Sequence, residues 1–166
     1  FSATTNDDES YRAWLHLSAA DIIEQSFDGQ HDSSVGANPG TNLPESSITN
    51  AAFVFTHSSP YKTLSGSTYT SQTTLFNSLN LATPNDNTTT AIKAALSPED
   101  AKILDKKIDD AVANTGILMG VTPNTTTDAS LACSNNSAIV GTAETSKGYL
   151  LTNKLAACMI LYKINK

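Results

Sequence analysis

The residues of this 166-residue chain best suited to covalent chemistry are its two cysteines, Cys133 and Cys158. Two thiols supply too few ligands for a structural zinc site. They can form a disulfide, which would close a large loop and stabilise the fold by roughly 2–4 kcal/mol, or remain as two buried free thiols. A disulfide would place the chain in an oxidising compartment such as the periplasm or the cell surface.

A pair of carboxylates, Asp109 and Asp110, stands at the C-terminal end of a predicted helix, where the helix dipole disfavours negative charge. Such a local conflict calls for a structural or functional reason. One interpretation is that a carboxylate accepts hydrogen bonds from backbone N–H groups of the turn through Asn114 and Gly116. The other is that the pair makes a subunit contact or binds calcium, which prefers carboxylate oxygens. Because no Asp-rich loop of calcium-binding spacing surrounds them, Asp109 and Asp110 are weak metal candidates, and we expect no cofactor.

The three histidines, His16, His31 and His57, are scattered along the chain and form no His-x-x-His or His-Glu arrangement. Serines are frequent, but the segment 65–67 lacks the Gly-x-Ser-x-Gly pattern of a nucleophile elbow. These patterns locate no catalytic site, and we expect the chain not to be an enzyme.

The composition narrows the classes of partner. The chain has 16 acidic and 10 basic residues, and no segment clusters Lys or Arg with aromatic residues as a nucleic-acid surface requires, so nucleic acid is not an expected partner. Charged residues make up only 16% of the chain, and Ser, Thr and Asn fill most connecting stretches, which suits an extracellular surface. No stretch approaches the roughly 20 apolar residues of a membrane span. The length fits a single domain over residues 1–166.

Two helices are predicted to position these residues. The first, over 6–25, places on one face Tyr11, Trp14, Leu15, Ser18 and Ile22. The second, over 97–112, begins at the cap residue Ser97 with Pro98 in its first turn. The stretch 28–47 reads as a long loop, and loops of that length are commonly functional or tied down by their own contacts.

Four segments have the residue pattern of β-strands, namely 51–57, about 73–81, 117–121 and 155–164. The last alternates two sets of mostly apolar residues, so one of its faces should be buried more deeply than the other. The order helix, loop, strands, helix, strands indicates an α+β fold and not the regular strand and helix alternation of a parallel sheet.

Three segments of the chain resemble bacterial type IV pilin-like proteins with a prepilin-type N-terminus. The segment 9–29, ESYRAWLHLSAADIIEQSFDG, is similar to the family's acidic-aromatic start with Trp, His-Leu, a small-residue pair and two aliphatics before Gly. The segment 96–116, LSPEDAKILDKKIDDAVANTG, is similar to a family helix that ends in Asp-Lys-Lys-Ile-Asp-Asp followed by Thr-Gly. The segment 157–164, ACMILYKI, is similar to the family's closing strand. Together they cover about a third of the chain, in the family's order.

The chain also departs from the family pattern. Asp21 and Ala111 stand where the family tends to have Gly, and Ala113 where it tends to have Pro, so the local helix and turn geometry could differ there. Members of the family begin with a long hydrophobic helix that anchors the precursor in the inner membrane and forms the filament core. Because the residues from Phe1 to Glu9 are polar, we expect that stalk helix to precede Phe1 or to belong to a separate polypeptide.

The resemblance implies a pilin-like head with an antiparallel β-sheet, helices and a C-terminal loop bounded by a disulfide between Cys133 and Cys158. It implies a structural subunit, a major or minor pilin of a type IV pilus or of a type II secretion-like pseudopilus, that acts by filament assembly and surface display. The expected partners are other pilin subunits, and the expected location is the bacterial surface or the periplasm, with membrane contact only through the stalk. The alternative is a minor-pilin adhesin or binding module that recognises a host surface or DNA.

Overall fold

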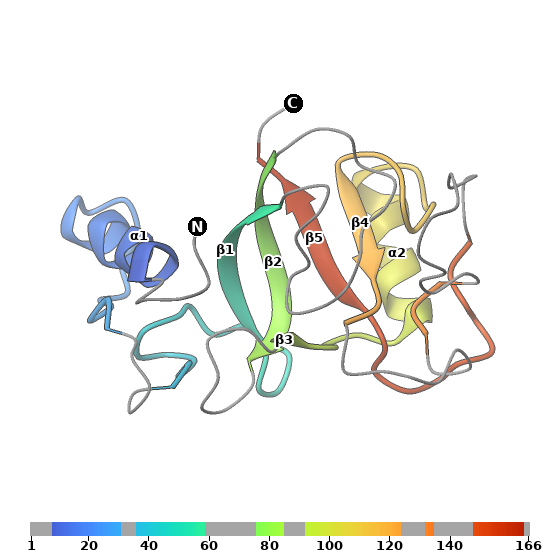
Figure 1. Cartoon of the computed structure of the whole chain (residues 1–166), viewed down its shortest axis with the longest axis horizontal. Coiled ribbons are helices and arrows are strands. Elements are labelled where there is room, and N and C mark those ends of the chain that lie inside the picture. The colour runs from blue at the N-terminus through green and yellow to red at the C-terminus, as the bar shows by residue number, and fades with distance from the viewer. Residues whose placement is uncertain are drawn as a thin grey trace.

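The computed structural model describes residues 8–30, 36–58, 76–84, 92–123, 132–134 and 148–164. The elements of these residues are, in chain order, α1 (Asp8–Ala19), β1 (Ala52–Ser58), β2 (Phe76–Pro84), β3 (Ile92–Lys93), α2 (Pro98–Ile108), β4 (Leu118–Val121) and β5 (Met159–Lys163). Figure 1 shows the strands in the middle of the molecule, with α1 beyond β1 at one end and α2 beside β4 toward the other. The predicted α+β class is confirmed.

The described strands form an antiparallel sheet in the order β1-β2-β5-β4, with the short β3 paired to β2. β1, β2, β4 and β5 overlap the four predicted strands, whereas β3 is an addition. The C-terminal strand β5 enters between β2 and β4, with Leu161 opposite both Asn80 and Met119. A strand in that position pairs on both sides, so the last segment of the chain is central to the sheet.

The two faces of the sheet carry separate apolar clusters, because alternate side chains of a strand point to opposite faces. On one face, Leu118 of β4 and Ile160 of β5 pack with Ala101 of α2. On the other face, the buried cluster comprises Ala82, Met119, Val121, Met159 and Leu161. Burial of β5 on both faces explains why its N-terminal half is apolar without interruption.

α2 begins where the sequence predicts and ends earlier. The hydroxyl of Ser97 accepts a hydrogen bond from the backbone N–H of Asp100 at 3.2 Å, as expected of an N-cap. The predicted end at residue 112 is wrong, because Asp109 leaves the helical conformation with φ -145° and Ala111 adopts the left-handed region with φ 63°. This early end creates the loop in which the candidate site lies.

α1 packs on the edge strand β1 through aromatic side chains. The ring of Trp14 stacks on that of Phe55, with 4.3 Å between ring centroids, and Tyr11 is buried in the same cluster. Burial raises the pKa of Tyr11 to about 12. The hydroxyl of Ser10 donates to the carbonyl oxygen of Phe55 at 2.5 Å. α1 is therefore attached to the sheet by both apolar burial and a hydrogen bond.

The predicted helix over 6–25 is longer than α1, which ends at Ala19; residues 6 and 7 lie outside the described residues. The backbone N–H of Ile22 donates to the carbonyl of Leu17 at 3.0 Å, and that of Asp21 donates to Ser18 at 3.1 Å. With Asp21 at φ 55°, these bonds form a Schellman motif, which turns the chain out of the helix. The predicted C-terminal end was therefore wrong.

The loop expected over 28–47 is held by Asn42, whose side chain is 0% exposed. Its amide nitrogen donates to the carbonyls of Gln30 and Gly36 at 2.8 and 2.9 Å, and its oxygen accepts from the N–H of Asn38 at 2.8 Å. In its described part, the loop is thus tied down by its own contacts.

Candidate functional site

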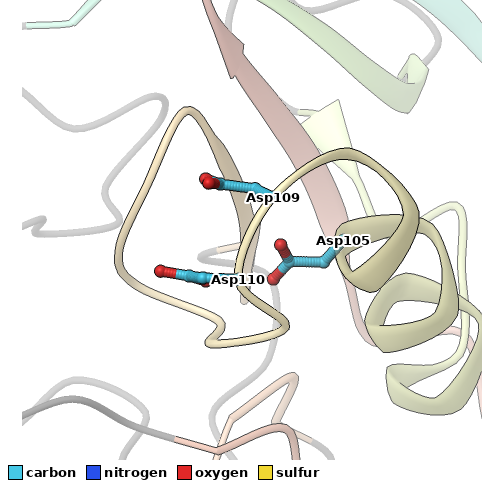
Figure 2. Close-up of side chains that lie close together, drawn as sticks. All are labelled: Asp105, Asp109 and Asp110. Atoms are coloured by element: carbon cyan, nitrogen blue, oxygen red, sulfur yellow. The ribbon is translucent and has the colours of Figure 1, made fainter.

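Three carboxylates gather at the C-terminal end of α2. Asp105, Asp109 and Asp110 each have an oxygen within 4.8 Å of the others. Figure 2 shows all three side chains directed toward the loop that follows the helix. Asp105 is buried, whereas Asp109 and Asp110 are exposed. Among the described residues, these three form the one group of at least three His, Cys, Asp or Glu side chains that lie close enough to share a cation.

Asp109 connects the end of α2 to the start of β4. Its Oδ2 atom accepts hydrogen bonds from the backbone N–H groups of Ile117 and Leu118, the second at 3.3 Å. Gly116 lies against this carboxylate with φ 76°, and a Cβ atom at that position would overlap it. Position 116 therefore requires glycine for both its conformation and the space.

Asp110 organises the turn itself. Its Oδ1 accepts from the N–H of Val112 at 2.8 Å, and its Oδ2 accepts from the hydroxyl of Thr115 at 2.5 Å. Asp109 and Asp110 thus both accept hydrogen bonds from the loop, as predicted, and these bonds offset their unfavourable position at a helix C-terminus. A role of either residue in a subunit contact or in calcium binding stays a prediction.

Asp105 is the buried member of the cluster, and the sequence reasoning missed it. Its carboxylate accepts a hydrogen bond from the Tyr149 hydroxyl at 2.8 Å and another from the backbone N–H of Ala111 at 3.2 Å. Burial raises the pKa of Asp105, and these two hydrogen bonds, which favour the ionised form, oppose the rise. Burial and the Asp105 carboxylate both raise the pKa of Tyr149. The available signal was the i, i+4 spacing of Asp105 and Asp109, which puts both at one end of the same helix face.

Tyr149 reaches Asp105 by packing over Gly120 of β4. A Cβ atom at position 120 would lie 2.8 Å from the Tyr149 hydroxyl oxygen and closer still to the ring. Glycine in a strand interior weakens the strand but allows such a close approach. The ring belongs to the same apolar cluster as Leu118 and Ile160. Tyr149 thereby fixes the C-terminal loop to both α2 and the sheet.

Cys133 and Cys158 form a disulfide, with 4.8 Å between their Cα atoms, and both residues are buried. The alternative of two free thiols is therefore wrong, and the pairing implied by the pilin resemblance is present. The carbonyl of Cys158 accepts the N–H of Leu96 at 3.0 Å. The disulfide thus joins the two ends of the C-terminal loop, and this hydrogen bond ties Cys158 to the segment that leads into α2.

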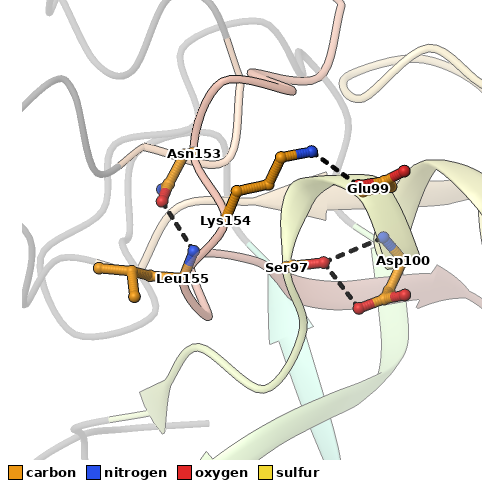
Figure 3. Close-up of polar contacts among 6 residues, drawn as sticks. All are labelled: Ser97, Glu99, Asp100, Asn153, Lys154 and Leu155. Atoms are coloured by element: carbon orange, nitrogen blue, oxygen red, sulfur yellow. Dashed lines mark hydrogen bonds and ion pairs between the residues drawn. The ribbon is translucent and has the colours of Figure 1, made fainter.

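A further contact holds the C-terminal loop at the N-terminal end of α2 (Figure 3). The ammonium group of Lys154 lies 2.8 Å from the carboxylate of Glu99. The side chain of Asn153 accepts from the N–H of Leu155 at 3.0 Å and donates to the carbonyl of Ala132 at 3.3 Å. Because Lys154 and Glu99 are largely exposed, their ion pair contributes at most about 1 kcal/mol. The loop bounded by the cysteines is therefore attached at both ends of α2.

The hydrogen bonds of the three carboxylates hold the loop after α2 in one conformation. The cluster is rich in the oxygen ligands that calcium prefers, but a cation would compete with the donors that all three carboxylates already bind. Of the three histidines, His16 is exposed on α1, His57 lies on β1 and His31 lies outside the described residues.

No family model, curated protein or solved structure matches this chain. Neither of the described helices combines the length and the apolar character that crossing a membrane requires.

Proposed function

We propose that this chain is the head domain of a type IV pilin or related pseudopilin, a structural subunit that acts by filament assembly and surface display. The observation that carries the proposal is the backbone at Asp21 and Ala111, where the chain lacks a glycine typical of pilins. Their φ angles are 55° and 63°, in the left-handed region that favours glycine. Among the other described non-glycine residues, only Asn50 shares that region. The chain thus makes a glycine-type turn at both positions without a glycine.

Two glycines inside the pilin-like segments support the same proposal. Gly29, which closes the segment 9–29, has φ 65°, and a Cβ atom there would lie 2.8 Å from the Leu15 side chain. Gly116, which closes the segment 96–116, has φ 76° and no room for a Cβ atom beside Asp109. The residues that carry the resemblance therefore stand where the backbone needs them.

The C-terminal part of the chain supports the proposal through its covalent tie and its place in the sheet. The resemblance implies a loop bounded by Cys133 and Cys158, and these cysteines are paired. The segment 157–164 contains β5, which lies between two other strands. A head domain built in this way has a rigid framework from which the disulfide-bounded loop can be displayed.

The acidic site fits a subunit that works by packing. Asp105, Asp109 and Asp110 each use their carboxylate to hold the backbone or the side chains of adjoining loops. Such bonds fix the shape of a surface loop without a bound group. A constant surface is what repeated contacts between identical subunits require.

Deletion of the gene, followed by electron microscopy of the cell surface, tests the proposal. We expect deletion to reduce or abolish filaments and a plasmid copy of the gene to restore them. Filaments unchanged in number and composition would overturn the proposal. Intact filaments with lost adhesion would instead favour the minor-pilin adhesin. The proposal also predicts a segment of about 20 apolar residues encoded upstream of Phe1 or on a partner chain.

A further inference from the structure

Charge is distributed unevenly along the chain. Residues 1–61 contain eight Asp or Glu and one Arg, while residues 62–166 contain eight Asp or Glu and nine Lys. The formal charges of the two parts are therefore -7 and +1, within a net charge of -6. In Figure 1, α1 from the first part lies at one end of the long axis, beyond β1, and α2 lies toward the other end. The helix α1, which belongs to the acidic part of the chain, thus lies at the end of the molecule opposite α2.

The α1 end presents an apolar side chain between two carboxylates. Ile22, the last residue of the Schellman motif, is 68% exposed, more than any other large hydrophobic residue described. Asp21 and Glu24 beside it are exposed, and neither side chain has an ion pair or hydrogen bond with another described residue. We name Asp21, Ile22 and Glu24 the acidic patch. Its complement would be an apolar centre flanked by cations.

The outer face of α2 has that composition. Ile103 is 50% exposed, and Lys106 and Lys107 follow it at the i+3 and i+4 positions, so all three lie on one helical face. Both lysines are exposed, and neither has an ion pair within the described residues. We name Ile103, Lys106 and Lys107 the basic patch.

The described acidic groups of α2 and of the turn after it already bind donors within the molecule. Glu99 pairs with Lys154 at 2.8 Å, and Asp100 accepts from the hydroxyl of Ser97 at 2.6 Å (Figure 3). The two carboxylates after the helix accept hydrogen bonds from the turn. Among the described residues, the lysines of the basic patch thus have no anionic partner, and an external anion could bind them.

We propose that the acidic patch of one copy of this chain docks on the basic patch of a second copy. The inference rests on the proposed filament function and names one contact through which subunits meet. Because the two patches differ and lie toward opposite ends of the molecule, the contact is heterologous, and each pair of copies keeps a free patch of each kind. Repetition of the contact gives an open chain. Contact between two acidic ends is disfavoured, because it brings charges of the same sign together.

Cross-linking of variants that each carry one added cysteine tests this contact. Ile22→Cys and Ile103→Cys proteins are mixed at low ionic strength under mild oxidation, with the native disulfide verified by mass. We expect the mixed dimer to form roughly five-fold faster than either dimer of one variant, an enhancement that salt removes. The matched control is Ile164→Cys, because Ile164 is 52% exposed and Ile103 is 50% exposed. Ile22→Cys mixed with this control should give only the statistical yield.

Charge reversal provides the second arm. The changes Asp21→Lys and Glu24→Lys in the first variant should reduce the mixed dimer to the statistical yield. Adding Lys106→Glu and Lys107→Glu to the Ile103→Cys variant should restore the excess of mixed dimer over the statistical yield. Equal yields from test and control pairs, or no response to reversal, would overturn the inference. Deletion of the gene separates this result from the proposed function. If the cross-linking fails but deletion removes filaments, this contact is refuted and the proposed function stands. If deletion leaves filaments unchanged, that result counts against the proposed function itself.

Discussion

The hydrogen bond between Tyr149 and Asp105 gives the sharpest quantitative prediction. Tyr149→Phe removes the hydroxyl that donates to Asp105 at 2.8 Å and keeps the ring that packs over Gly120. A hydrogen bond to a charged group contributes roughly 1.5–3 kcal/mol, and Asp105 is 0% exposed, so water cannot replace the donor. We expect the free energy of unfolding to fall by about 2 kcal/mol. In a domain of this size, that loss lowers Tm by roughly 4–8 °C.

Urea denaturation followed by the fluorescence of Trp14 measures this loss. Asp105→Ala should lower the unfolding free energy by about 3–5 kcal/mol, because it also removes the acceptor of the Ala111 N–H. In a double-mutant cycle, the two changes together should cost about 2 kcal/mol less than their sum. The control is Tyr162→Phe, at a tyrosine that is 39% exposed, with an expected change below about 0.5 kcal/mol. A Tyr149→Phe protein as stable as this control, or a cycle without coupling, would refute the reasoning.

The pH dependence of stability tests the same site. Because burial raises the pKa of Asp105 above its ordinary 3.8, there is a pH window above that value in which the folded state holds a proton that the unfolded state has lost. This group therefore adds stability as the pH falls through the window and loses that contribution as the pH rises through the folded-state pKa. Asp105→Asn removes the titration. We compare the two proteins by subtracting the unfolding free energy of the wild type from that of the Asn variant. This difference should be largest near neutral pH and should decrease as the pH falls toward about 4. A difference that is constant with pH would contradict the assigned cause.

The remaining predictions concern turns and the disulfide. Asp21→Gly and Ala111→Gly should each raise the unfolding free energy by about 0.5–1 kcal/mol, because glycine occupies the left-handed region without strain. The control Ala113→Gly should lower the unfolding free energy. Thermal scans that rank the three variants differently would reject this explanation. Replacing both Cys133 and Cys158 by Ser should lower the unfolding free energy by roughly 2–4 kcal/mol. Alkylation of the urea-denatured protein without reductant should add no mass, so two added labels would disprove the disulfide.

The features that the sequence predicted well have local signals. α2 is marked by Ser97 and Pro98 within its own first turn, and its apolar face follows helical spacing. Asp109 and Asp110 attract attention because negative charge conflicts with the dipole at a helix end. The prediction that their carboxylates accept hydrogen bonds from the turn depends only on residues that are close in the sequence. Both the helix and the exposed half of the site could therefore be inferred from short stretches of sequence.

The features that the sequence did not predict depend on distant residues or on one backbone conformation. The bond from Tyr149 to Asp105 spans 44 residues, and a single Asp inside a helix is ordinary until a partner is known. The strand order β1-β2-β5-β4 is likewise set by contacts between distant segments. The run around Asp21 continues a helical pattern, so the end of α1 at Ala19 becomes visible only through its left-handed turn.

Immunogold labelling of cell-surface filaments with antibodies raised against this chain is the most direct test of its assignment as a filament subunit. We predict gold particles on the filaments, along the shaft for a major subunit or at sparse positions for a minor one, and none on cells that lack the gene. Labelling confined to the cell body or the medium, on cells that carry unlabelled filaments, would contradict the assignment.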